Sequence, residues 1–176
     1  MKKIILQILF ILSILLAAAV IGTLVWIHRP YELPNDSSQK DIQVFYAENV
    51  HESNGYAEYF IPGDSELSDQ IMRFLDTIGM RYCWDSYYPK QSYPRGEWDE
   101  DISGYEYASL AVAYNIGDVG VDVYMMAEYF DYVVVTIFDE DDRTSQMIRV
   151  DSSAFHMGIR ELLKNAQEYL IKEGNN

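Results

Sequence analysis

Cysteine is almost absent from this chain, since Cys83 is the only one among 176 residues. An intrachain disulfide is therefore excluded, and a hydrophobic core has to stabilise the fold. After the N-terminal region only His51 and His156 could join Cys83 as zinc ligands, and no CxxC or HExxH motif occurs. We therefore expect no zinc site and no cofactor, and we expect the cysteine to be buried and inert between Tyr82 and Trp84.

Basic charge is also scarce, and no glycine-rich phosphate-binding loop is present. After residue 29 the chain carries 10 Lys and Arg residues against 28 Asp and Glu residues, a net charge of −18. Such a field repels nucleic acid and anionic lipid headgroups, and it attracts cations or basic protein surfaces. We expect no nucleic-acid partner. The simplest interpretation of the acidity is that it keeps the domain soluble.

One long hydrophobic run is present, from Ile4 to Ile27, and only three of its residues are polar. As a helix rising about 1.5 Å per residue it would be about 36 Å long, which exceeds the roughly 30 Å hydrocarbon core of a bilayer. Lys2 and Lys3 precede the run, whereas Arg29 alone follows it closely. This bias predicts a single-pass protein of the cell membrane with a cytoplasmic amino terminus. Residues 1–29 would form the cytoplasmic stub and signal-anchor.

A cleaved signal peptide is the alternative, with Ala17–Ala19 as the cleavage region. Hydrophobicity resumes at Val20 and continues to Ile27, which is longer than an ordinary secretory core, so we favour the uncleaved anchor. Residues 30–41 contain two prolines and a polar run, which predicts a flexible linker. Residues 42–176 would then form one extracytoplasmic domain.

Two amphipathic helices are predicted in that domain. The first has Asp64 or Ser65 as its N-cap, carries apolar residues at helical spacing to Ile78, and is terminated by Gly79 at the C′ position. The second is predicted from Ser153 to Lys172 on the same kind of apolar stripe.

Short β-prone segments account for most of the remaining domain. They are Ile42–Ala47, Tyr56–Ile61, Tyr105–Tyr114, Val121–Met126, Phe130–Phe138 and Thr144–Val150. The last four follow one another through short gaps, which favours an antiparallel meander. The sequence therefore predicts an α+β protein: an N-terminal transmembrane helix, then a two-layer domain with an antiparallel meander sheet packed by two amphipathic helices.

The stretch from Tyr82 to Tyr105 is unusually rich in aromatic residues and is interrupted by prolines and a glycine. Aromatic side chains on a loop suit binding to sugars, peptides or a protein partner, because they lose little rotamer entropy. The predicted ligand-binding residues are Tyr87, Tyr88, Tyr93 and Trp98. Alternatively, these aromatics fold back over the sheet and complete the core.

The acidic run 139–142 is a candidate Ca²⁺ site, with Asp139, Asp141 and Asp142 as ligands. It lacks the EF-hand spacing, and successive residues cannot all converge on one ion. A solvated hairpin tip is the alternative that we favour.

Asp151, Ser152 and His156 form the only local Ser/His/Asp grouping. A catalytic triad needs convergent geometry and oxyanion donors, which adjacency in sequence does not supply. We expect instead that Asp151 and Ser152 cap the last helix.

These observations favour a membrane-anchored, non-enzymatic domain that binds a protein or cell-wall partner outside the cytoplasm. A second hypothesis is an extracytoplasmic hydrolase acting on carbohydrate or peptide, with Glu97, Asp99 or His156 beside the aromatic residues. A third is an immunity-type inhibitor whose acidic surface binds a basic toxin. The sequence does not indicate the oligomeric state.

Overall fold

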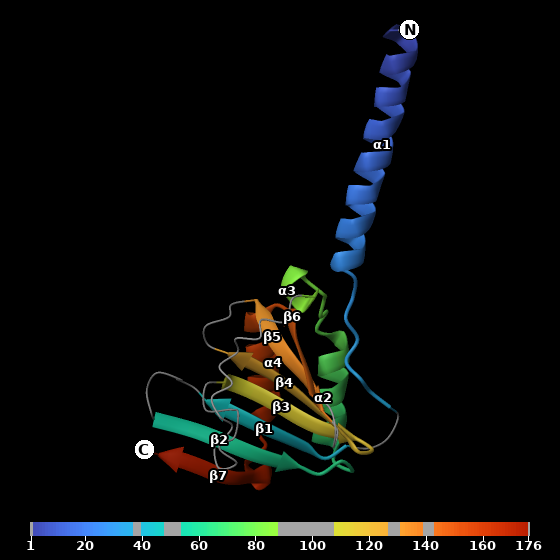
Figure 1. The fold of residues 1–176 in the computed structure, drawn as a ribbon. Coiled ribbons are helices and arrows are strands. Elements are labelled where there is room, and N and C mark those ends of the chain that lie inside the picture. The colour runs from blue at the N-terminus through green and yellow to red at the C-terminus, as the bar shows by residue number, and fades with distance from the viewer. Residues whose placement is uncertain are drawn as a thin grey trace.

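The computed structural model describes residues 2–36, 40–47, 54–87, 108–126, 131–138 and 143–175. Helix α1 (Lys2–Ile27) projects from one end of the domain (Figure 1), and its side chains from Lys3 to Trp26 are exposed. It is long and apolar enough to cross a membrane, with a mean hydropathy of 3.0 over its most apolar 18 residues. A signal sequence near the amino terminus would have the same properties.

The domain contains a seven-stranded sheet whose neighbours all pair antiparallel, in the order β6-β5-β4-β3-β1-β2-β7. The strands are β1 (Ile42–Ala47), β2 (Asn54–Ile61), β3 (Ala108–Ile116), β4 (Val119–Met126), β5 (Tyr132–Phe138), β6 (Arg143–Arg149) and β7 (Leu170–Asn175). Strands β3 to β6 pair in sequence order, so the predicted meander is confirmed. At the β3–β4 turn, Gly117 adopts a φ of 58°, a conformation that glycine accepts at little cost.

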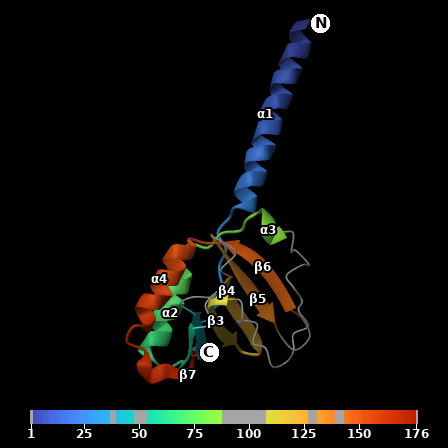
Figure 2. The same ribbon diagram turned by 90° about the vertical axis from the view of Figure 1, so that its left-hand side faces the viewer.

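Helices α2 (Glu66–Thr77) and α4 (Ser152–Leu163) lie together on one face of the sheet (Figure 2). The Ser65 side chain accepts a hydrogen bond from the Ser68 amide at 3.1 Å and so caps the start of α2. Gly79, with a φ of 73°, follows the end of the helix. Both predicted boundaries of this helix are confirmed, as is the α+β fold of two layers.

The core lies between the two helices and the sheet. From the helices, Ile71, Phe155 and Ile159 are fully buried. From the strands, alternate residues point at the helices, as the two-residue period of a strand requires. The fully buried strand residues in the core include Ile42, Val44, Leu110, Val112, Val121, Val123 and Val133. Burying each such side chain contributes roughly 1.5–3 kcal/mol.

The carboxy-terminal segment differs from its prediction as one long helix. α4 ends at Leu163, a short 3₁₀ turn covers Gln167–Tyr169, and the chain continues as β7. β7 pairs with β2, which would otherwise leave an open edge of main-chain hydrogen-bonding groups. This long-range pairing overrides the weak local preference for a helix, so the predicted helix beyond residue 163 is wrong.

The segment that joins α1 to the sheet packs on the domain. Tyr31 and Leu33 are buried, and the Tyr31 amide donates to the carbonyl of Met80 at 3.0 Å. The Tyr114 hydroxyl donates to the carbonyl of Pro34 at 2.9 Å. The sequence predicts a flexible linker over residues 30–41. Instead residues 30–36 belong to the packed body of the domain, because their apolar side chains reach its core.

Candidate functional site

Most of the residues predicted to bind a ligand lie outside the described part of the chain. This applies to Tyr88, Tyr93 and Trp98, and also to Glu97, Asp99, Asp139, Asp141 and Asp142. Tyr87 is the last residue of the short helix α3 (Trp84–Tyr87). The roles suggested for these residues therefore stay predictions.

Helix α3 begins the aromatic stretch and packs on strand β6. The buried Ser86 hydroxyl donates to the carbonyl of Met147, and the Cys83 amide donates to the Ser86 hydroxyl at 3.0 Å. Cys83 itself is 4% exposed, which confirms the predicted burial of the thiol. Trp84 points outward and is 51% exposed. The start of the aromatic stretch is thus fixed on the sheet with one large aromatic side chain at the surface.

Asp151, Ser152 and His156 each have a structural contact of their own. Asp151 Oδ1 accepts a hydrogen bond from the Ala154 amide at 2.9 Å, which confirms Asp151 as the cap of α4. The Ser152 hydroxyl accepts a hydrogen bond from the Asp131 amide at 3.3 Å. The His156 ring packs against that of Tyr46, with centroids 5.1 Å apart. These contacts explain the three residues without catalysis.

The base of α1 is attached to the domain through Arg29. Its guanidinium carbon lies 4.7 Å from the ring centre of Trp26 and 4.1 Å from that of Tyr82. Tyr82 in turn packs edge-on against Tyr31, with centroids 5.0 Å apart. Ile27, the last helical residue, is only 3% exposed. The end of α1 is therefore part of the domain's packing.

A small irregular ladder lies beside this junction. Pro30 bridges to Arg81, and Arg81 bridges to Arg149. The amide of Arg81 donates to the carbonyl of Arg149 at 3.0 Å, and the amide of Arg149 donates to the carbonyl of Arg81 at 2.9 Å. Three segments far apart in sequence thus meet at the end of the domain from which α1 projects.

An open hollow of about 520 Å³ is found here. Its lining residues are His28, Gly79, Arg81, Asp131, Arg149, Val150 and Asp151. The lining therefore includes two arginines and two aspartates, together with His28, which follows α1. The arrangement suits a small ligand that carries both signs of charge.

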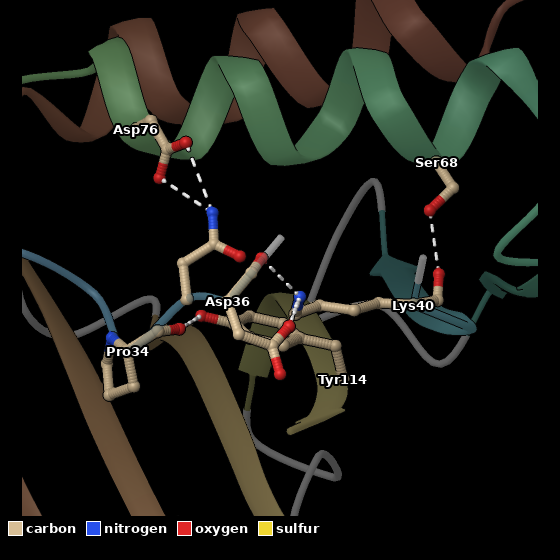
Figure 3. Close-up of polar contacts among 7 residues, drawn as sticks. Pro34, Asp36, Lys40, Ser68, Asp76 and Tyr114 are labelled. Carbon is tan, nitrogen blue, oxygen red and sulfur yellow. Dashed lines mark hydrogen bonds and ion pairs between the residues drawn. The ribbon is translucent and has the colours of Figure 1, made fainter. Parts of the chain in front are cut away.

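A second polar cluster fastens the connecting segment to α2 and β3 (Figure 3). Lys40 Nζ, with a side chain 1% exposed, donates to Asp36 Oδ1 at 2.5 Å and to the Asp36 carbonyl at 2.9 Å. The Ser68 hydroxyl donates to the carbonyl of Lys40 at 2.7 Å. Asn35 donates to the carboxylate of Asp76 at 3.3 Å. Because a buried ammonium group needs such partners, this cluster is structural.

Two tyrosines, Tyr31 and Tyr114, have pKa values that are raised above the ordinary value for tyrosine. Burial, with a smaller contribution from Tyr82, raises the pKa of Tyr31 to about 12. Burial also raises the pKa of Tyr114, and Tyr31 and Asp76 add to that effect. Both hydroxyls therefore stay protonated at neutral pH, as packing groups do.

Within the described ranges, no three His, Cys, Asp or Glu side chains gather in a way that could hold a metal ion. Comparison with protein-family models, with curated proteins and with solved structures gives no match for this chain.

Of the residues that line the hollow, the sequence singles out Gly79 and Asp151, and it does so as the end of one helix and the cap of another. Arg81 and Arg149 read as ordinary surface residues, and only the pairing of their segments brings them together. One signal was present: basic residues are rare in this domain, so two of them in one place are notable.

Proposed function

We propose that this chain is a single-pass membrane protein whose α+β domain binds a partner outside the cytoplasm and has no catalytic role. The supporting observation is that α1 exposes apolar side chains along its whole length, whereas Ile27 at its end is buried in the domain. At about 1.5 Å per residue, its 26 residues span about 39 Å, enough to cross a bilayer. Such an apolar surface in water would aggregate, so lipid is its natural surrounding.

The structure around residue 27 favours retention of the helix over cleavage. Cleavage after Ala19 would leave Val20, Ile21 and Val25 on the mature protein, and these are 51%, 61% and 68% exposed. An uncleaved anchor keeps all of them in lipid. The lysines at positions 2 and 3 favour a cytoplasmic amino terminus and a domain outside the cytoplasm.

The binding role rests on the aromatic stretch from Tyr82 to Tyr105. Its start is fixed on β6 by Ser86, and Trp84 is exposed there. Trp84, on a helix that Ser86 attaches to β6, can contact a protein or cell-wall ligand without a large entropic cost. The acidic surface favours a partner with basic groups.

Two measurements test the topology. Alkaline carbonate washing should leave the full chain in the membrane pellet, and protease added to intact cells should remove the carboxy-terminal domain. The matched control is protease on cells that have been lysed. A mature protein that begins near residue 20, or a domain that is protected until lysis, would contradict the proposal.

A capture experiment from solubilised membranes tests the binding role. We expect the wild-type chain to recover a partner and the combined Tyr87→Ala, Tyr88→Ala and Trp98→Ala variant to lose it. Phe138→Ala, which removes an aromatic side chain 37% exposed on β5, is the control and should behave as wild type. Equal recovery by all three proteins would argue against the aromatic stretch as the binding surface.

A further inference from the structure

Two arginines face each other directly at the end of the domain that carries α1. Arg81 and Arg149 exchange both main-chain hydrogen bonds, so their side chains project from the same side of the ladder. Like charges in directly opposite positions repel and are unfavourable. In the part of the chain that the structure describes, no side chain forms an ion pair or a hydrogen bond with either guanidinium group.

The same hollow has an acidic wall. Asp131 adopts a left-handed φ of 67°, a conformation that residues other than glycine rarely adopt. Its main chain is held on both sides, since the Val150 amide donates to its carbonyl at 3.0 Å and its own amide donates to Ser152. Asp151, the cap of α4, is the second carboxylate. Among the described residues, the lining of the hollow thus includes two basic and two acidic residues.

The position of the hollow relates it to the lipid surface. His28, which follows the last residue of α1, forms part of its wall. With α1 across a bilayer, the residues just beyond Ile27 lie at the level of the lipid headgroups. The hollow therefore opens where phosphate and amine groups are concentrated.

We propose that this hollow binds the headgroup of a zwitterionic aminophospholipid, which carries one phosphate and one primary ammonium group. Arg81 and Arg149 bind the phosphate, because guanidinium groups donate paired hydrogen bonds to phosphate oxygens. Asp131 and Asp151 accept hydrogen bonds from the ammonium group. The inference rests on the membrane anchoring proposed above.

The charges of the domain argue for this lipid over others. An anionic lipid would leave the two carboxylates unpaired and would enter the field of a domain with a net charge of −18. A choline headgroup has no N–H donor for the carboxylates. An ethanolamine headgroup offers a phosphate to the two arginines and an N–H donor to the two aspartates. A cavity of about 520 Å³ falls in the usual size range of small-ligand sites.

Native mass spectrometry of the full-length protein in detergent, titrated with single lipids, tests the proposal. We expect one phosphatidylethanolamine to be retained in preference to phosphatidylcholine or phosphatidylglycerol. Arg81→Gln and Arg149→Gln should each weaken this binding roughly tenfold or more, as loss of a hydrogen bond from a charged group does. Arg73→Gln, which removes the same charge from the exposed face of α2, should bind as wild type.

The Asp131→Asn variant tests recognition of the ammonium group more specifically. Asparagine tolerates the left-handed backbone conformation, so the substitution removes only the charge. This variant should lose the preference for ethanolamine over choline while it still binds a phosphate-containing lipid. Thermal unfolding of each variant establishes that the fold is intact.

Equal binding of the three lipids, or unchanged binding by both arginine variants, would overturn the proposal. Saturable binding of inorganic phosphate at the arginines, with no lipid preference, would also overturn it, since the ligand would then be a free anion. The alkaline carbonate wash tests the membrane anchor independently. Release of the chain by the wash would contradict the proposed anchor. Retention of the chain in the membrane without any lipid preference would contradict only the lipid-binding proposal.

Discussion

The guanidinium carbon of Arg29 lies 4.1 Å from the ring centre of Tyr82, so a residue just beyond the apolar helix is stacked on the segment that leads into α3. The main chain strengthens this link, since the Tyr82 amide donates to the Arg29 carbonyl at 3.0 Å. With Ile27 buried, the last turn of α1 and the domain form one packed junction. Motion of the domain relative to the helix is therefore restricted at this point.

Arg29→Ala should loosen the junction. Because the cation–π contacts with Trp26 and Tyr82 are lost, we expect a destabilisation of about 1–2 kcal/mol. Hydrogen exchange at the amides of Tyr31 and Tyr82, measured in detergent, should become faster. Arg29→Lys should keep part of the protection, and Arg160→Ala on α4 should change nothing at these amides. Exchange rates equal to those of the wild type would show that the stacking does not hold the junction.

Gly63→Ala should destabilise the domain. A Cβ at this position would lie 2.8 Å from both the carbonyl carbon and the amide nitrogen of Lys40, and main-chain atoms cannot move aside as a side-chain tip can. Overpacking of this kind costs about 1–3 kcal/mol, to be measured by urea unfolding followed by circular dichroism. Gly22→Ala has no neighbouring atom within 4 Å and serves as the control. A Gly63→Ala protein as stable as wild type would mean that the two segments approach less closely.

Asp151→Ala should lower stability by about 1 kcal/mol, because the Ala154 amide loses its capping partner. Asp151→Asn should restore most of the loss, since its amide oxygen can still accept that hydrogen bond. The comparison, made by thermal unfolding, separates the capping role from any effect of charge. Equal losses in the two variants would indicate that charge matters more than the cap.

Alkaline pH should unfold the domain through its buried tyrosines. Because the pKa of Tyr31 is raised from 10.0 to about 12, the stabilisation from burying its neutral hydroxyl is complete below pH 10 and is lost as the pH rises from 10 to 12. Tyr114, whose pKa is also raised by burial, acts in the same direction.

The free energy of unfolding, measured as a function of pH, should therefore fall across that window. The Tyr31→Phe variant should show a shallower fall. Tyr114→Phe should also be less stable at neutral pH by about 1 kcal/mol, because its hydrogen bond to Pro34 is lost. A flat profile between pH 10 and 12 would contradict the burial of these hydroxyls.

Local pattern was enough to predict several elements of the fold. Ser65 caps the start of α2, and Gly79 terminates the helix. Both signals act on residues close by in the sequence, so the boundaries could be predicted. The meander of β3 to β6 follows from strands joined by short turns, which can pair only with their neighbours.

Long-range pairing could not be predicted in the same way. β1 lies between β2 and β3, and β7 joins the edge at β2, although β7 comes from the far end of the chain. The stripe of apolar residues in the last segment favours a helix, although the segment after Tyr169 forms a strand. Only the main-chain groups on β2 decide between them.

The sequence by itself determined that this protein has one membrane-length apolar helix and an acidic domain of strands and two amphipathic helices, because these depend on the order of apolar and polar residues. The tertiary structure alone decided that residues 30–36 pack on the domain and that Arg81 and Arg149 meet beside His28. Such contacts join segments that are distant in sequence. They form because the whole core brings the ends of α1, α2 and β6 to one place, and no local pattern encodes that meeting.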